Sequence, residues 1–235
     1  YASTDSSDAI ACNMFAYCLG TPILLQDPDG KDSFGVSIGF SFWIFGWGAI
    51  GIIFVSGDIV KLCFGEKYIL DMSIPFILAL NFYIVGMQNA VYTYKNTMGL
   101  FRYGQYILLI TASINLVLDI ILGKTMGIFG IYLASAIARL LTNIWYEPYA
   151  VFKYGLKVSS FHYLKKYIEY AIVLCVTGGI CCFLCNLCQF YIVVNVLLKF
   201  AICSIVPNII FYVCYHKTDE GKYLIEIIKS VLRKI

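Results

Sequence analysis

The chain has 235 residues, of which 60% are hydrophobic and only 13% are charged. Soluble domains average about 25% charged residues, so these few charges cannot cover a surface that faces water. The mean hydropathy of +0.80 therefore indicates an integral membrane protein. The net charge of +3 is not gathered into a basic stripe, so no nucleic-acid partner is expected. We expect an all-α fold, a polytopic transmembrane helix bundle.

Apolar runs divide the chain into four parts. We expect a transmembrane bundle over residues 1–150, an amphipathic cytoplasmic linker over 151–166, two additional transmembrane helices over 167–215 and an amphipathic cytoplasmic tail over 216–235. A partial span at 8–25, or alternatively a disordered leader, precedes full spans expected at 34–56, 69–94, 106–123, 126–145, 167–188 and 190–215. Because the chain begins at Tyr1 and has no signal peptide pattern, we expect an N-terminal part to be missing.

The hairpin of the third and fourth spans carries one charge in each span. Lys124 and Thr125 are expected to form its turn, with Asp119 before the turn and Arg139 after it. A charge inside a span costs roughly 2.5–3.5 kcal/mol on insertion scales, so each should face protein, a water-filled cavity or an interface. With a rise of about 1.5 Å per residue, the two charges would differ in height by about 13 Å. We therefore expect no direct ion pair between them.

Lys199 is a third charge inside a span. It lies roughly ten residues from either end of its span, too deep for its side chain to reach water easily. We expect Lys199 to line a cavity or to pair with a group on another helix.

Small residues recur inside the spans. The first full span contains glycines that either allow close helix packing or are simply tolerated: Gly35, Gly39, Gly46, Gly48 and Gly51. Four cysteines cluster in the fifth span: Cys181, Cys182, Cys185 and Cys188. Without a nearby histidine or zinc-finger spacing, we interpret these cysteines as small apolar residues and expect neither a metal site nor a cofactor.

The basic residues predict the orientation. Most lysines and arginines, among them Lys95 and Arg102, fall in loops on one side of the bundle, so this side is expected to be cytoplasmic, with the C-terminus. The amphipathic segments at 151–166 and 217–235 suit the surface of a membrane and predict anionic lipid as a partner. A tail packed on the protein is the alternative.

Residues suited to catalysis are scarce. The two histidines, His162 and His216, lie in stretches outside the expected spans, and no acidic pair or His–Asp spacing stands out. Acid–base chemistry needs such groups in position. We therefore do not expect an enzyme.

Two segments, Asn81–Phe101 and Ile114–Gly155, resemble the C-terminal half of bacterial flippases for lipid-linked oligosaccharides. These flippases belong to the multidrug/oligosaccharidyl-lipid/polysaccharide exporter superfamily and serve O-antigen and capsule synthesis. The resemblance also includes the Phe64-Gly65-x-x-Tyr68 pattern. Its remaining motif residues are Gly99, Asn115, Gly127, Gly130, Glu147 and Pro148.

The resemblance implies a two-lobed transporter around a central cavity, of which this chain would be most of the second lobe. The implied substrate is an undecaprenyl-diphosphate-linked sugar unit, flipped across the bacterial inner membrane for lipopolysaccharide or other surface polysaccharide synthesis. Arg139 and Lys199 would hold its diphosphate and sugars, and Asp119 would couple transport to H⁺ or Na⁺. Relatives often carry an acidic residue where this chain has Thr111, and a small polar residue where it has Arg139.

Three alternatives stay open. A cation-coupled antiporter for drugs or metabolites belongs to the same superfamily, although the chain lacks a clear acidic cluster. An integral membrane enzyme and a non-transporting membrane subunit come from other classes.

Overall fold

A computed structural model describes residues 31–68, 71–100, 104–156, 161–187, 191–216, 218 and 221–222. These residues are almost entirely helical and include no strand, which confirms the expected all-α fold. The elements are α2 (Lys31–Phe64), η2 (Glu66–Tyr68), α3 (Ser73–Thr97), α4 (Gln105–Met126), α5 (Ile128–Leu141), α6 (Asn143–Ala150), η4 (Val151–Leu156), α7 (Phe161–Asn186) and α8 (Ile192–Tyr215). The expected partial span at 8–25, most of the tail, Arg102 and Cys188 lie outside the described residues, whereas His162 belongs to the first turn of α7.

Six stretches of the described chain are long and apolar enough to cross a bilayer. Five of them fall within single helices, whereas the fourth, Ile128–Gly155, runs through α5, α6 and most of η4. The chain is therefore a multi-pass membrane protein.

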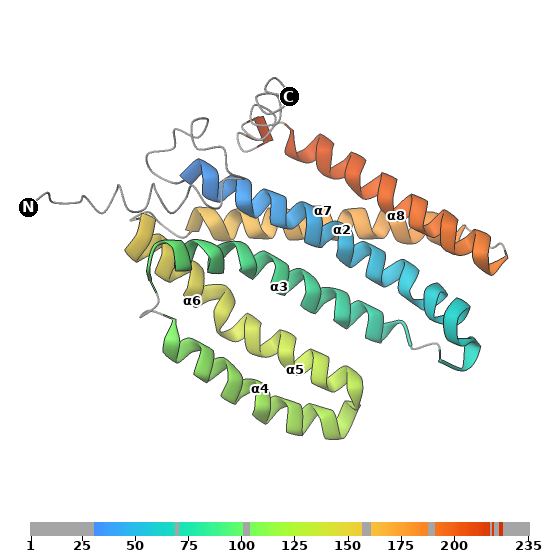
Figure 1. Cartoon of the computed structure of the whole chain (residues 1–235), viewed down its shortest axis with the longest axis horizontal. Helices are drawn as coiled ribbons and strands as arrows, with labels where there is room; N and C mark the ends of the chain where they lie inside the picture. The colour runs from blue at the N-terminus through green and yellow to red at the C-terminus, as the bar shows by residue number, and fades with distance from the viewer. Residues whose placement is uncertain are drawn as a thin grey trace, which may run out of the picture.

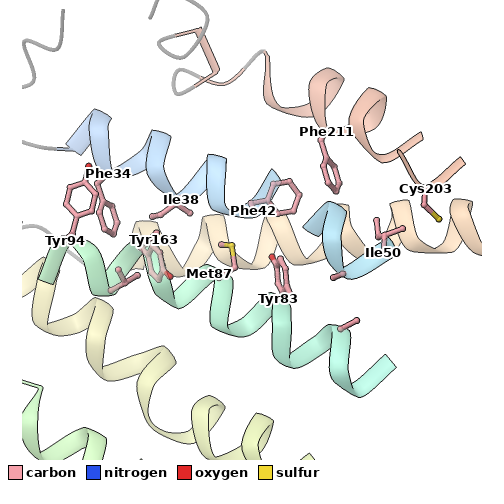
Figure 2. Close-up of a cluster of buried hydrophobic side chains, with 14 of the residues drawn as sticks. Phe34, Ile38, Phe42, Ile50, Tyr83, Met87, Tyr94, Tyr163, Cys203 and Phe211 are labelled. Atoms are coloured by element: carbon pink, nitrogen blue, oxygen red, sulfur yellow. The ribbon is translucent and has the colours of Figure 1, made fainter. Parts of the chain in front are cut away.

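The helices lie side by side, with α4 at one edge of the bundle and α8 at the opposite edge (Figure 1). Between these edges, α2 packs on α3, and α3 packs on α5 and α6. The main hydrophobic core lies where α7 and α8 meet α2 and α3, and Figure 2 shows its side chains converging from these four helices. Rings dominate this core: Phe42 stacks on Tyr170 with centroids 4.5 Å apart and lies 4.7 Å from Phe211.

The glycines of α2 and α3 are positions of close helix packing. An added Cβ at Gly39 would overlap the Tyr215 phenol of α8, and one at Gly86 would overlap the Phe45 ring of α2. Gly46 and Gly48 also lie against side chains of neighbouring helices, whereas Gly51 faces open space. The packing interpretation therefore holds for Gly39, but it fails for Gly51.

Several element boundaries differ from those expected. Helix α2 continues to Phe64, beyond the expected end of the span at residue 56, and α3 continues to Thr97, which places Lys95 inside a helix. The expected surface linker also begins differently, because residues 151–156 continue the fourth span as the π-helical η4. Val151 and Phe152 are buried in the main core, so these two residues pack inside the bundle.

Replacing Gly86 with alanine should lower the stability of the fold, because the new methyl group must displace the Phe45 ring. Overpacking of this kind costs about 1–3 kcal/mol, and we expect a lower unfolding temperature for the purified protein in detergent. Gly178→Ala in α7 is the matched control, since an added Cβ there meets nothing. It should be neutral or stabilising because alanine favours a helix, and equal losses in both variants would contradict the packing argument.

Candidate functional site

A row of polar contacts, here called the polar seam, joins α3 to α5 and α6. Its members are Asn81 Nδ2 to the Tyr132 carbonyl (2.8 Å), Arg139 Nη1 to Gln88 Oε1 (3.5 Å) and Lys95 Nζ to Glu147 Oε1 (2.9 Å). Residue numbers increase in the same order on α3 and on its partner helices, so α3 runs parallel to α5 and α6. The α3 members are seven residues apart, which is about 10 Å per step along a helix. Polar groups therefore recur through the depth of the bundle.

The deepest-buried contact of the seam is the ion pair between Lys95 and Glu147. Each side chain is only 4% exposed. Gly104, just before α4, lies so close that an added Cβ would touch Lys95 Nζ. The charge of Lys95 is thus compensated inside the protein, and this residue is not the loop lysine that the sequence indicated for the cytoplasmic side.

Two motif glycines occupy positions that need a left-handed backbone. Gly99 ends α3 with φ of 68°, where the Leu100 amide donates to the Lys95 carbonyl at 3.0 Å. Gly127, with φ of 61°, forms the turn between α4 and α5. Glycine adopts these angles without the steric cost of a Cβ. The turn therefore lies at Gly127, beyond the expected Lys124 and Thr125, which belong to α4.

The fourth span is interrupted at Thr142, between α5 and α6 (Figure 1). Thr142 Oγ1 donates to the Ala138 carbonyl at 2.6 Å and lies 2.7 Å from Thr111 Oγ1 of α4. Thr111 Oγ1 is also 2.8 Å from Asn143 Oδ1. Pro148 follows inside α6. Interrupted helices mark substrate or ion sites in many transporters. The break at Thr142 therefore makes the polar seam a candidate binding site.

Arg139 and Asp119 have no ion-pair partner among the described residues. Arg139 contacts Gln88 at 3.5 Å, and Asp119 Oδ2 accepts a hydrogen bond from Asn115 Nδ2 at 3.0 Å. The two charges do not pair with each other, as expected. Their difference in height is smaller than expected, however. With the turn at Gly127 and a rise of about 1.5 Å per residue, the two Cα atoms differ in height by about 6 Å.

Lys199 pairs with Asp58 of α2, with Nζ and Oδ2 2.5 Å apart and side chains 19% and 21% exposed. Of the two expected roles, pairing with another helix is the one observed. An apolar groove of about 330 Å³ lies beside this pair, between α2 and α8. Closer to the end of α2, Lys61 Nζ lies 2.6 Å from Glu66 Oε1, and this bond lowers the pKa of the Glu66 carboxyl below its usual value.

One face of α3, here called the open face, is only partly covered by the described residues. Its members recur at helical spacing and are exposed: Leu78, Phe82, Val85, Asn89 and Tyr92. Asn89 has no hydrogen-bond partner in the described part of the chain, and it lies eight residues before the end of α3. A carboxamide facing hydrocarbon without a partner costs several kcal/mol, so Asn89 is suited to contact water or a polar protein group.

Two cysteines of the fifth span are part of the hydrophobic core. Cys181 and Cys185 of α7 are buried in the main core together with Cys203 of α8, whereas Cys182 is exposed. Within the described residues, no group of three or more His, Cys, Asp or Glu side chains is arranged to hold a metal ion.

Sequence reasoning identified Arg139, Lys199 and Asp119 but missed their surroundings. Gln88, Asn89 and Asp58 were not singled out. The recurrence of Asn81, Gln88 and Lys95 every seven residues was the available signal, because residues at this spacing lie on one helix face.

Comparison with known proteins identifies no relative. The chain matches no model of a known protein family, and the curated proteins and the solved structures give no significant match.

Breaking the ion pair between Lys95 and Glu147 should destabilise the protein strongly. Glu147→Ala leaves a buried lysine without a partner, a change that costs about 3–5 kcal/mol. The double variant Lys95→Met/Glu147→Leu removes both charges and should recover much of this loss. Thermal unfolding of the purified variants in detergent measures both effects.

Lys165→Ala provides the control, because the pair of Lys165 with Glu169 is mostly exposed at 3.8 Å. Exposed pairs contribute at most about 1 kcal/mol, so only a small shift is expected. A double variant as unstable as Glu147→Ala would show that the seam does not depend on charge compensation.

Proposed function

We propose that the chain forms part of a membrane transporter that flips undecaprenyl-diphosphate-linked oligosaccharides for bacterial cell-surface polysaccharide synthesis. The observation that carries the proposal is a pair of polar groups at membrane depth: exposed, unpartnered Asn89 on α3 lies near the level of Arg139, which has no counter-charge in the described residues. A helix surrounded only by lipid gains nothing from such groups. The resemblance of Asn81–Phe101 and Ile114–Gly155 to flippases supports the same function.

The chemistry of the substrate matches these groups. A diphosphate with attached sugars cannot cross hydrocarbon without polar contacts, and a guanidinium can bind phosphate oxygens in bidentate fashion. By the resemblance, the open face of α3 would line the cavity between this lobe and the lobe supplied by the rest of the transporter. The proposed location is the inner membrane, with a cytoplasmic C-terminus and anionic lipid around the protein.

Asp119 is the proposed site for the coupling ion. Its Oδ1 atom and the Oδ1 atom of Asn115 are both buried without a donor in the described chain. An uncompensated carboxylate with one unused oxygen, next to an unused amide oxygen, suits a proton or a monovalent cation. This arrangement would also serve the alternative of a cation-coupled antiporter, which differs in its substrate.

The open face of α3 should be accessible from water. We expect Asn89→Cys, in membranes, to react with a charged, membrane-impermeant thiol reagent, because a polar path there holds water. Ile172→Cys in α7 is the control, since its side chain is 58% exposed within an apolar stripe and should face lipid. Mass spectrometry of the peptides separates these sites from native cysteines. Equally low labelling at both positions would contradict a polar path along α3.

Transport itself is tested with the protein expressed from its complete reading frame and reconstituted into vesicles that contain a polyprenyl-diphosphate-linked sugar. A membrane-impermeant enzyme that oxidises the sugar reports how fast the inner-leaflet pool reaches the outer leaflet. Arg139→Ala should slow this rate about tenfold or more, since bonds to a charged group contribute about 1.5–3 kcal/mol. Lys124→Ala, at the exposed end of α4, should leave it unchanged. No flipping by the unaltered protein would overturn the function.

A further inference from the structure

The middle contact of the polar seam, between Gln88 and Arg139, differs from the contacts on either side of it. Asn81 Nδ2 donates to two carbonyls, those of Tyr132 at 2.8 Å and Ile77 at 3.0 Å. The Lys95 pair is a closed ion pair. By contrast, Gln88 Nε2 is buried and has no acceptor in the described chain. The middle of the seam therefore has unused hydrogen-bond donors.

The orientation of the Gln88 carboxamide follows from chemistry. A guanidinium only donates hydrogen bonds, so the Gln88 oxygen must face Arg139 and the Gln88 nitrogen must point elsewhere. Turning the amide over would set donor against donor without satisfying Nε2. A buried donor without an acceptor destabilises the protein. Neither orientation of the Gln88 amide therefore gives Nε2 an acceptor within this pair.

Arg139 adds further donors at the same place. It has five N–H groups, one contact of 3.5 Å and no carboxylate partner among the described residues. It lies eleven residues after the start of α5, which is about 16 Å along the helix and near the middle of a bilayer core of about 30 Å. A positive charge at this depth needs an anion or water.

We infer that Gln88 and Arg139 together form a binding site for a phosphate group, in which the Gln88 Nε2 and the Arg139 guanidinium donate to phosphate oxygens. This inference rests on the proposed function and names the residue that accompanies Arg139 in holding the substrate's diphosphate. Gln88 also positions Arg139, because its oxygen accepts from the guanidinium. A phosphate supplies acceptors for every unused donor and charge for Arg139.

Gln88→Glu is the decisive variant. It keeps the shape of Gln88, replaces the unused donor with an acceptor and places a carboxylate next to Arg139. We expect unchanged or higher thermal stability without ligand, since Arg139 gains a partner, but at least tenfold weaker binding of a prenyl diphosphate. Asn186→Asp is the matched control, because it adds the same charge at the exposed end of α7, outside the polar seam. It should weaken binding much less.

Binding is measured with the purified full protein in detergent as the shift in unfolding temperature with farnesyl diphosphate, farnesol and inorganic diphosphate. Farnesyl diphosphate should stabilise the protein and farnesol should not. If inorganic diphosphate also stabilises the protein, the phosphate group is sufficient for binding. If it does not, the prenyl chain is required as well. Either result supports the site, provided that Gln88→Glu abolishes the stabilisation. Undiminished stabilisation of Gln88→Glu, or equal stabilisation by farnesol, would overturn the inference.

This experiment is separable from the transport test. Binding that depends on Gln88, in a protein that does not flip the lipid-linked sugar, would retain the phosphate site and reject the transport function. Flipping that is insensitive to Gln88→Glu would retain the function and reject the site.

Discussion

The ion pair between Lys95 and Glu147 constrains the arrangement of the helices around it. Both side chains are almost fully buried, so separating them would leave two uncompensated charges in a medium of low dielectric. The pair holds the end of α3 on α6, and Gly104 packs against it where the chain enters α4. The position of α3 relative to the fourth span, and with it the polar seam, depends on this contact.

The polar seam combines rigidity with one open position. Its contacts repeat every seven residues because α3 runs parallel to α5 and α6, and parallel helices with this repeat keep the same faces in contact. The two outer contacts give each donor nitrogen an acceptor, through an ion pair and a double carbonyl contact. The middle contact does not, since a guanidinium and a carboxamide together offer more donors than acceptors. The outer contacts therefore fix the geometry of the middle one, where we propose that a phosphate group binds.

The charges within the spans are of two kinds. Lys199 and Asp58 neutralise each other across α8 and α2, and this pair joins α8 to the core. Arg139 and Asp119 lie in neighbouring helices without such partners in the described chain. Charges that are paired stabilise a helix arrangement, whereas unpaired charges at membrane depth are retained for ligands, ions or water. The unpaired charges lie on α4 and α5, and these helices therefore carry the candidate site.

The sequence by itself determined the all-α fold and the approximate spans, because apolar length is a local property that a bilayer converts directly into helices. It also identified the charges at Arg139, Asp119 and Lys199, but not their environments. Only the tertiary structure decided that Lys95 is buried against Glu147, that Lys199 is neutralised by Asp58, and that Gln88 faces Arg139. These partners lie far apart along the chain, so no local pattern specifies them. The seven-residue spacing of Asn81, Gln88 and Lys95 marks a common face, but which helix packs on that face is decided by packing.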